Sequence, residues 1–303
     1  MMDSERLDPR RHAYRADLAD VRLEGRVDAE RFVPGARRRV RRASIALRKA
    51  PVPILGFETE LLFGETVLEF EAADGWSWVQ ADRDDYVGYI PTDALDEHHA
   101  PSTHRVSAIG TFLYSEASMK SPPLMHLSIN TPLVVEATEN PFCRLSTGGW
   151  IVARHVAAQT KVARDFVDIA ERLIGVPYLW GGRTRIGVDC SGLVQLAMEA
   201  AGLPCPRDSD MQAAEVGENL LVPDSLDGLR RGDLVFWPGH VGMMVDGMLL
   251  LHANAHHMAV VVEPLSIAVA RIEKSGSGLS SVKRPQALSA EPVAASRASD
   301  ENE

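Results

Sequence analysis

The chain contains 303 residues, of which 45% are hydrophobic, and its formal net charge is 32 − 42 = −10. This length is sufficient for two or three separate cores, and the acidic balance argues against a nucleic-acid or membrane partner. The first residues are charged throughout and lack the apolar region of a signal peptide. No apolar run approaches the ~20 residues of a membrane span. We therefore expect a soluble, cytoplasmic protein.

The chain has three cysteines, Cys143, Cys190 and Cys205. Their number is odd, and their spacing shows no pattern of pairs. Disulfide frameworks of small secreted domains normally contain an even number of cysteines. The set therefore argues against disulfide bonds and indicates a reducing compartment.

The two ends of the chain have polar compositions. Residues 1–35 contain few of the apolar patterns that indicate a buried core, so we expect an N-terminal arm. The basic run ARRRVRR at residues 36–42 could bind an anion, but we favour a solvated arm or an edge strand. Residues 285–303 are rich in Ala, Ser, Pro and Glu, which is typical of a disordered tail.

A weak internal repeat indicates two similar all-β units. The segment VLEFEAADGWSWV (67–79) aligns with LVVEATENPFCRL (133–145) at an offset of 66, whereas the glycines that end the copies, Gly88 and Gly149, are 61 apart. The first copy thus carries 66 − 61 = 5 extra residues, around QADRDDY. Short alternating segments between turn residues predict small barrels at residues 36–98 and 99–158. The pattern resembles tandem bacterial SH3-like barrels.

The pattern changes after residue 159. The segments RDFVDIAERLIG and CSGLVQLAMEAAG space their apolar residues at helical intervals and end in Gly175 and Gly202. From Gly232 onward the apolar residues follow the two-residue period of strands, in GDLVFW, HVGMMV, MLLLHA and AVVVEP. We therefore expect an α+β domain at residues 159–284, in which helices precede an antiparallel sheet.

Cys190 lies in the segment GVDCSGLV, directly before a helical pattern. If the helix begins at Cys190, its unpaired N–H groups and its dipole favour a thiolate. Asp189 is a candidate N-cap. The side chains of the next residues, Ser191 and Gly192, are small and leave space around the sulfur. This polar setting favours a nucleophile over a buried structural cysteine.

A nucleophilic thiol needs a base, and His240 and His252 are the best candidates. The segment HVGMMVDGMLLLH predicts a β-hairpin, and we expect a three-residue loop, 245–247, with Gly247 in the left-handed conformation. This loop pairs His240 with His252 on one face, with Gly242 leaving room beside them. His240 would then take the thiol proton while His252 fixes its tautomer.

A metal site is the alternative use of the same residue types. Cys190, His240, His252 and His256 could form a tetrahedral set. However, the chain has no Cys-x-x-Cys pair, and one cysteine beside two histidines fits catalysis better. We expect no metal and no other cofactor.

Five motifs occur in an order that resembles the NlpC-type family of papain-like cysteine peptidases, which cleave bacterial cell-wall peptides. The motifs are PYLWGG (177–182), DCSGLV (189–194), RDSDMQ (207–212), RGDLVFW (231–237) and HVGMMVDGMLLLHA (240–253). The resemblance implies an α+β papain-like domain with the triad Cys190, His240 and His252. It also implies that Tyr178 supports the oxyanion together with the Cys190 backbone N–H, as a phenol donor can do.

The preceding barrels resemble those of the subgroup that hydrolyses the bond between γ-D-glutamate and a diamino acid, usually meso-diaminopimelate. In that subgroup the residues after the first helix bind the free N-terminus of the substrate, which here implies Asp208 and Ser209. Asp208 could equally cap a helix through residues 211–212. From the first barrel, the resemblance implies Glu65 and Tyr86 at the same end of the cleft, although packing within the barrel is the simpler role for both.

The resulting hypothesis is a γ-D-glutamyl-L-diamino-acid endopeptidase that acts on released wall peptides with a free N-terminal L-Ala. Asp189 and Ser191, on either side of Cys190, are further candidates for substrate contact. Two alternatives stay open: an acyltransferase or other amidase with the same triad, and a non-catalytic module that binds wall peptides. The sequence gives no indication of the oligomeric state or of the preferred diamino acid.

Overall fold

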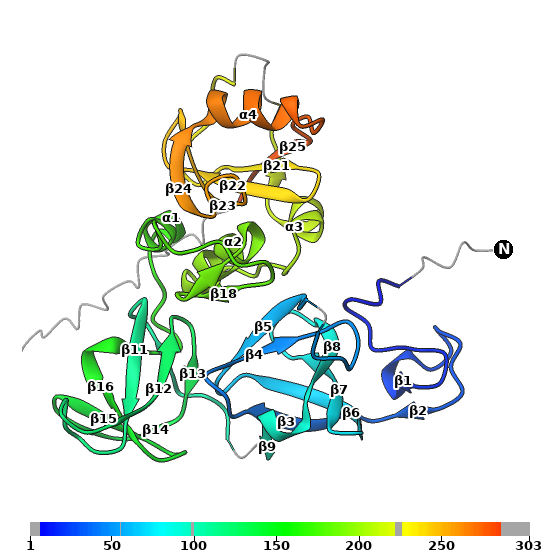
Figure 1. Ribbon diagram of the computed structural model, residues 1–303, viewed down its shortest axis with the longest axis vertical. Coiled ribbons are helices and arrows are strands. Elements are labelled where there is room, and N and C mark those ends of the chain that lie inside the picture. Colours follow the sequence, from blue (N-terminus) through cyan, green and yellow to red (C-terminus); the bar gives the residue numbers. More distant parts are fainter. Residues whose placement is uncertain (1–6, 55, 98–99, 222–225, 286–303) are drawn as a thin grey trace, which may run out of the picture.

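The computed structural model describes residues 7–54, 56–97, 100–221 and 226–285. Except for Pro285, the tail expected to be disordered lies outside the described residues. Two all-β units lie side by side, and an α+β domain lies above them in Figure 1. Among the described residues, no helix is long and apolar enough to cross a membrane.

The N-terminal segment is an ordered extension of the first barrel, not only an arm. It contains the parallel pair β1 (Ala19–Asp20) and β2 (Phe32–Val33), joined by the 3-10 helix η1 (Val21–Leu23). The buried side chains of Ala13 and Leu18 pack with the aromatic rings of Phe70 and Trp78 in the barrel. These few apolar contacts hold a segment that has little core of its own.

The first barrel consists of a five-stranded sheet with the order β8-β7-β6-β3-β9 and a separate pair, β4-β5. These strands share one buried core, which includes Val40, Leu47, Leu61, Val67 and Ile90. The elements are β3 (Ala36–Val40), β4 (Ser44–Leu47), β5 (Thr59–Leu62), β6 (Thr66–Ala73), β7 (Trp76–Ala81), β8 (Val87–Pro91), η2 (Thr92–Ala94) and β9 (Leu95–Glu97).

The basic run at residues 36–42 is neither a solvated arm nor an edge strand, because β3 lies between β6 and β9. Acidic side chains of the same barrel neutralise its guanidinium groups. Arg38 donates to Glu69 at 2.8 Å, and Arg42 donates to Asp93 at 2.7 Å. The Arg38–Glu69 pair joins β3 to β6, and such cross-strand pairs allow a strongly basic strand inside a sheet.

The second all-β unit repeats the strand plan of the first. Trp76 begins β7 and Phe142 begins β15, which is the alignment that the repeat predicted. A Cβ atom on Gly88 would lie 2.1 Å from Leu47 Cδ2, so this glycine marks a close approach of two strands. The elements are β10 (His104–Val106), β11 (Gly110–Tyr114), β12 (Pro123–Ser128), β13 (Pro132–Leu133), β14 (Val135–Glu139), β15 (Phe142–Leu145), β16 (Trp150–Val152), η3 (Ala153–His155) and β17 (Val156–Ala158).

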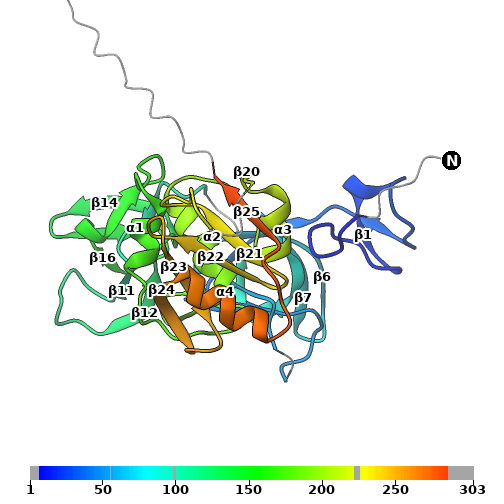
Figure 2. The same ribbon diagram turned by 90° about the horizontal axis from the view of Figure 1, so that it is seen from above.

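The third domain is α+β, with helices before an antiparallel sheet of order β20-β25-β21-β22-β23-β24, as the sequence predicted. Helix α2 packs on one face of the sheet and α4 on the other (Figures 1 and 2). The elements are α1 (Phe166–Glu171), β18 (Arg183–Thr184), β19 (Gly187–Val188), α2 (Cys190–Ala200), α3 (Ser209–Glu215), β20 (Glu218–Asn219), β21 (Leu234–Trp237), β22 (His240–Met244), β23 (Leu249–Asn254), β24 (Ala259–Pro264), α4 (Leu265–Lys274) and β25 (Ser281–Arg284).

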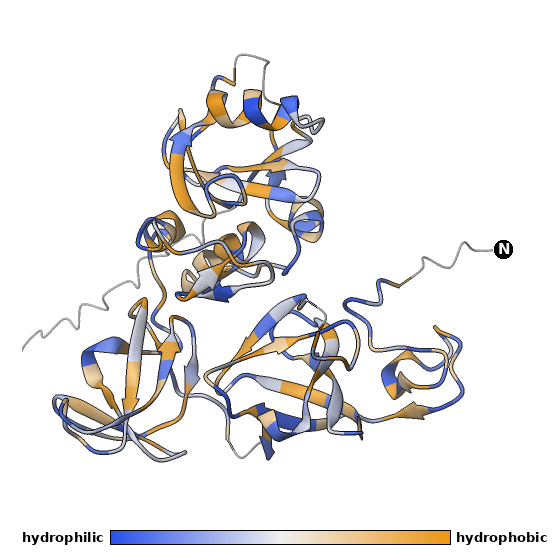
Figure 3. Ribbon diagram, in the orientation of Figure 1, coloured by the Kyte–Doolittle hydropathy of each residue, from blue (hydrophilic) through white to orange (hydrophobic). Residues whose placement is uncertain are grey.

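The core of this domain fixes the start of α2. The apolar residues predicted on α2, including Leu193, Val194 and Leu196, are all buried against the sheet. In Figure 3, the strand β24 of the same sheet is coloured mostly as hydrophobic. Because this stripe orients α2, the first turn of the helix is held at the end of the domain that faces the first barrel.

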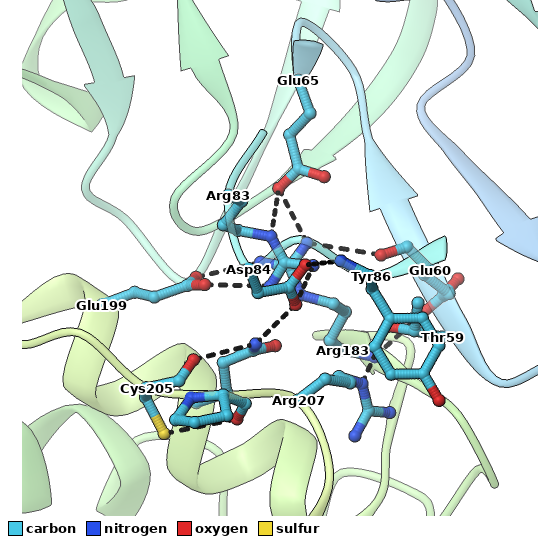
Figure 4. A network of polar contacts seen from close by, with 12 residues as sticks. Thr59, Glu60, Glu65, Arg83, Asp84, Tyr86, Arg183, Glu199, Cys205 and Arg207 are labelled. Atoms are coloured by element: carbon cyan, nitrogen blue, oxygen red, sulfur yellow. Dashed lines mark hydrogen bonds and ion pairs between the residues drawn. The ribbon is translucent and has the colours of Figure 1, made fainter. Parts of the chain in front are cut away.

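A buried polar network joins the first barrel to the α+β domain (Figure 4). The five-residue insertion predicted from the repeat contributes Arg83, which pairs with Glu199 of α2 at 2.9 Å, and Asp84, which accepts from Gln195 at 2.8 Å. Arg183 pairs with both Glu65 at 2.8 Å and Glu199 at 2.9 Å. These contacts dock the barrel in one orientation on the domain that carries Cys190.

Candidate active site

Cys190 is the first residue of α2, and Asp189 is its N-cap, as the sequence predicted. The Asp189 carboxylate accepts the Gly192 backbone N–H at 2.7 Å. As the first helical residue, Cys190 has a backbone N–H without an acceptor inside the helix. The Val241 N–H is directed at the Cys190 sulfur, so β22 begins beside the candidate nucleophile.

The expectation of a resting thiolate is wrong. Burial, together with the neighbouring Asp189 carboxylate, raises the pKa of the Cys190 thiol to about 12. The backbone N–H groups of Val241 and Ser191 lower the pKa, but by less. The thiol is therefore neutral near pH 7 and needs a base when it attacks.

The hairpin that carries the histidines differs in register from the prediction. Met243 pairs with Leu251 and Met244 with Leu250, so the loop is 246–248 and His240 is not opposite His252. Gly247 does not adopt the left-handed conformation. Instead, the Asp246 carboxylate accepts the backbone N–H groups of residues 248 and 249, which stabilises the shifted turn.

The two imidazoles nevertheless meet, because a shift of two residues keeps both on one face. His240 Nε2 lies 2.9 Å from His252 Nδ1. The His240 ring also packs against the Trp237 ring at 5.6 Å between centroids. His252 is fully buried, so the pair forms a fixed unit at the start of β22.

Glu263 on β24 extends this pair and was not predicted from the sequence. Its Oε1 lies 2.8 Å from His252 Nε2 and also accepts from Arg271 of α4. The Asn254 Nδ2 group, a donor, lies 2.9 Å from the same His252 nitrogen and would require that nitrogen to accept. The Glu263 carboxylate requires it to donate, and this charge-assisted bond is the stronger of the two. We therefore assign the proton to His252 Nε2, which leaves Nδ1 to accept from His240 Nε2. The remaining lone pair, on His240 Nδ1, can then accept a proton.

Both imidazoles are neutral at pH 7. Burial lowers the pKa of His240 to about 3 and that of His252 to about 4, although the Glu263 carboxylate raises the latter. His240 adjoins Val241, whose backbone N–H contacts the Cys190 sulfur, and a neutral imidazole in this place can act as a general base toward a neutral thiol.

We expect the substitution Glu263→Gln to lower kcat about tenfold, because an amide accepts the His252 proton less strongly and no longer selects one tautomer. Steady-state kinetics on a peptide substrate would measure this, with Glu273→Gln, on the exposed side of the same helix as Arg271, as control. Equal kcat values for the two variants would show that Glu263 has no part in orienting the histidines.

Tyr178 lies beside Cys190 and is half-buried. Burial, together with the nearby Cys190 and Asp189 side chains, raises the pKa of its hydroxyl to about 12, so the phenol keeps its proton. Within the described part of the chain this hydroxyl has no hydrogen-bond partner. It is thus available, like the Cys190 N–H, as a donor to a developing oxyanion.

The structure places Asp189 and Ser191 in a buried cluster around Arg207, a residue that the sequence analysis quoted in a motif but did not single out. Arg207 is 1% exposed and donates to Asp189 at 2.7 Å, to Ser191 at 2.8 Å and to Thr59 of the first barrel at 2.7 Å. These bonds occupy Asp189 Oδ2 and the Ser191 hydroxyl. Both residues therefore support the start of α2, and direct substrate contact by them stays a prediction.

Asp208 and Tyr86 meet at the end of α3 that faces the first barrel. The Tyr86 hydroxyl donates to Asp208 Oδ2 at 3.0 Å. Asp208 holds the N-cap position of α3, but its side chain caps no backbone N–H. Ser209 is half-buried and begins α3. Glu58, which sequence reasoning missed, lies near enough to Tyr86 to raise the pKa of its hydroxyl.

Glu65 does not join this acidic group. Its carboxylate accepts the Leu62 backbone N–H at 2.9 Å and pairs with Arg183 at 2.8 Å and with Arg83 at 3.3 Å. In Figure 4, the Glu65 carboxylate points toward the arginines at the centre of the network. Its side chain serves the docking of the barrel, and substrate contact by Glu65 stays a prediction.

In the part of the chain that the structure describes, no group of three or more His, Cys, Asp or Glu side chains could hold a metal ion. His256 packs against His257 in the turn after β23 instead.

Residues 175–271 match the NlpC/P60 family, and residues 47–95 match the bacterial dipeptidyl-peptidase SH3 domain. A gamma-D-glutamyl-L-lysine dipeptidyl-peptidase of Bacillus subtilis (strain 168) is 32% identical over 220 residues, which are 65% of this chain and 72% of the relative. The chain belongs to the NlpC/P60 family. It is an NlpC/P60 peptidase, and the matched range contains Cys190, His240 and His252.

Other proteins resemble this NlpC/P60 peptidase over more than half of its length. Dipeptidyl-peptidase 6 of Lysinibacillus sphaericus is 27% identical over 190 residues, which are 61% of this chain and 65% of the relative. The crystal structure of an NlpC/P60 family protein from Bacillus cereus has a TM-score of 0.70 at 19% identity and covers 82% of this chain and 99% of its own. This likeness shows a shared fold. The SH3 match lies within the first barrel, so the assignment of the second barrel stays a prediction.

Proposed function

We propose that this NlpC/P60 peptidase hydrolyses the bond between γ-D-glutamate and an L-diamino acid in released cell-wall peptides with a free N-terminal L-Ala. The diamino acid would be meso-diaminopimelate or L-lysine, and the reaction would serve peptidoglycan recycling in the cytoplasm. The observation that carries the proposal is Asp208, a partly buried carboxylate next to Tyr86 at the barrel end of the site. The names of relatives that act on γ-D-glutamyl-L-lysine support the substrate class.

In the proposed reaction, the Cys190 sulfur attacks the γ-carbonyl carbon while His240 Nδ1 takes the thiol proton. The Tyr178 hydroxyl and the Cys190 N–H donate to the resulting oxyanion. His240 then gives its proton to the amine of the diamino acid as the C–N bond breaks, leaving a thioester. Water attacks this thioester, one of its protons passes to His240 and then to the sulfur, and the free dipeptide leaves.

Recognition of the free amine supports cleavage after two residues. An ammonium group bound by Asp208 would fix the distance between the N-terminus of the peptide and the bond that Cys190 attacks. Tyr86 and Glu58 of the first barrel lie at the same end, where the barrel would limit longer peptides. A charge-assisted hydrogen bond to the ammonium contributes ~1.5–3 kcal/mol to binding.

The experiment offers L-Ala-γ-D-Glu-L-Lys, its meso-diaminopimelate analogue and the N-acetylated forms to the wild type and to Asp208→Asn. For the wild type we expect kcat/KM to fall about 10- to 100-fold on acetylation, which removes the ammonium charge. For Asp208→Asn the free and acetylated peptides should be cleaved at similar, low rates. Mass spectrometry should identify L-Ala-γ-D-Glu as a product.

Two results would contradict the proposal. Equal cleavage of free and acetylated peptides by the wild type would exclude an amine-binding site. Products from a different bond, or transfer of the acyl group to another amine, would favour an amidase of other specificity or an acyltransferase.

A further inference from the structure

The N-terminal segment reaches the catalytic domain at the proposed amine site. Arg10, which precedes the first barrel, donates through Nη1 to Asp208 Oδ2 at 2.9 Å. We infer that Arg10 is a positioning residue for substrate recognition, which makes the N-terminal segment a third wall of the amine subsite. This inference rests on the proposed function, in which Asp208 binds the substrate ammonium.

The two carboxylate oxygens of Asp208 differ in their hydrogen bonds. Oδ2 accepts from both Arg10, at 2.9 Å, and the Tyr86 hydroxyl, at 3.0 Å. Oδ1 has no hydrogen-bond partner among the described residues. Two donors from different parts of the chain thus fix the plane of the carboxylate and leave one oxygen available for an ammonium.

Arg10 is itself held in place, so it can fix its partner. Its guanidinium pairs with Asp8 at 2.7 Å and with Asp210 of α3 at 2.8 Å, and its backbone N–H donates to Asp8 at 2.8 Å. The group of Asp8, Asp208 and Asp210 around Arg10 keeps a formal charge of 1 − 3 = −2. Arg10 therefore orders the acidic group without cancelling its attraction for a cation.

Arg10 also counteracts the effect of burial on Asp208. Burial raises the pKa of the Asp208 carboxyl, whereas Arg207, the Tyr86 hydroxyl and Arg10 lower it. Arg10 is accessible to solvent, because it lines a cavity of about 320 Å³ together with Glu58 and Tyr86. Loss of its charge would leave Asp208 harder to ionise, and less able to bind an ammonium at mildly acidic pH.

The test compares Arg10→Gln, Arg10→Lys and the control Arg11→Gln in the full-length protein. Arg11 belongs to the same segment and pairs with Glu215 of α3, but it has no contact with Asp208 among the bonds described. We expect Arg10→Gln to raise KM for free L-Ala-γ-D-Glu-L-Lys about tenfold with kcat changed less than about twofold, and Arg10→Lys to restore most of the binding. Arg11→Gln should behave as the wild type.

The pH dependence of KM distinguishes a positioning role of Arg10 from a role only in docking the N-terminal segment on the α+β domain. The rise in KM for Arg10→Gln should grow as the pH falls from about 7 to about 5, because the Asp208 carboxyl then takes up a proton more readily than in the wild type. A rise in KM that is the same at every pH, or that Arg11→Gln shares, would overturn the inference. An unchanged KM would also overturn it.

Asp208→Asn distinguishes failure of the inference from failure of the proposed function. If Asp208→Asn raises KM for the free peptide while Arg10→Gln does not, Asp208 binds the amine without help from Arg10. If neither variant changes KM, the amine site itself is wrong. Thermal unfolding of each variant would show whether the N-terminal segment stays folded on the barrel.

Discussion

Replacing Cys190 by alanine is expected to lower kcat by about 10⁴-fold or more, because the sulfur forms the covalent intermediate. The structure supports this expectation through the place of Cys190 at the first turn of α2, beside β22 and Tyr178. Substitution of His240 by alanine should have an effect of similar size, since a thiol with a pKa of about 12 is inert without a base. The measurement is hydrolysis of the free tripeptide, followed by mass spectrometry.

Cys143→Ala is the matched control for the loss of a thiol. Cys143 is a buried residue of the second barrel, in the core with Leu113 and Ile151, and lies on a different unit from Cys190. Its removal should reduce stability slightly and leave kcat within about twofold of the wild type. Activity retained by Cys190→Ala would exclude this residue as the nucleophile.

Replacing Arg207 by methionine is expected to lower the free energy of unfolding by about 3–5 kcal/mol, because it leaves buried partners without a countercharge. Arg207 is 1% exposed, and its guanidinium joins Asp189, Ser191 and Thr59. Without it, the Asp189 carboxylate would remain buried beside Cys190, and the barrel would lose a bond to the start of α2. Denaturant unfolding and kcat should therefore both report the loss.

Arg231→Met provides the comparison for Arg207→Met. Arg231 pairs with two acids, Asp165 and Glu171, at 2.7 Å, whereas Arg207 pairs with one, but the Arg231 side chain is 37% exposed. A surface ion pair of this kind contributes roughly 0–1 kcal/mol. If the two variants lose similar stability, then the buried cluster around Arg207 is not what holds the first barrel to the start of α2.

Local patterns predicted the elements that carry the chemistry. The Asp-Cys-Ser sequence before an apolar stripe places Cys190 at a helix start because capping and amphipathicity depend on neighbours in the chain. The alternation in the hairpin predicts that His240 and His252 share a face. The loop was misplaced, since the Asp246 side chain rather than Gly247 stabilises the turn, but a shift of two residues left the face unchanged.

Long-range contacts account for what the sequence did not predict. Glu263, Arg207 and Arg10 act on residues that lie 11, 18 and 198 positions away, and no periodicity encodes such pairs. The same holds for Glu65, whose carboxylate is taken by arginines of two different domains. The pKa of Cys190 was misjudged because the helix start favours the thiolate, whereas burial by packed neighbours outweighs that effect.

By itself, the sequence determined the family, the order of helices and strands, and the cysteine and histidines of the site, because these depend on motifs and on local periodicity. Only the tertiary structure decided which acids and arginines orient those residues, and that the resting thiol is neutral. The physical reason is that hydrogen bonds and desolvation act through space, between side chains that folding brings together.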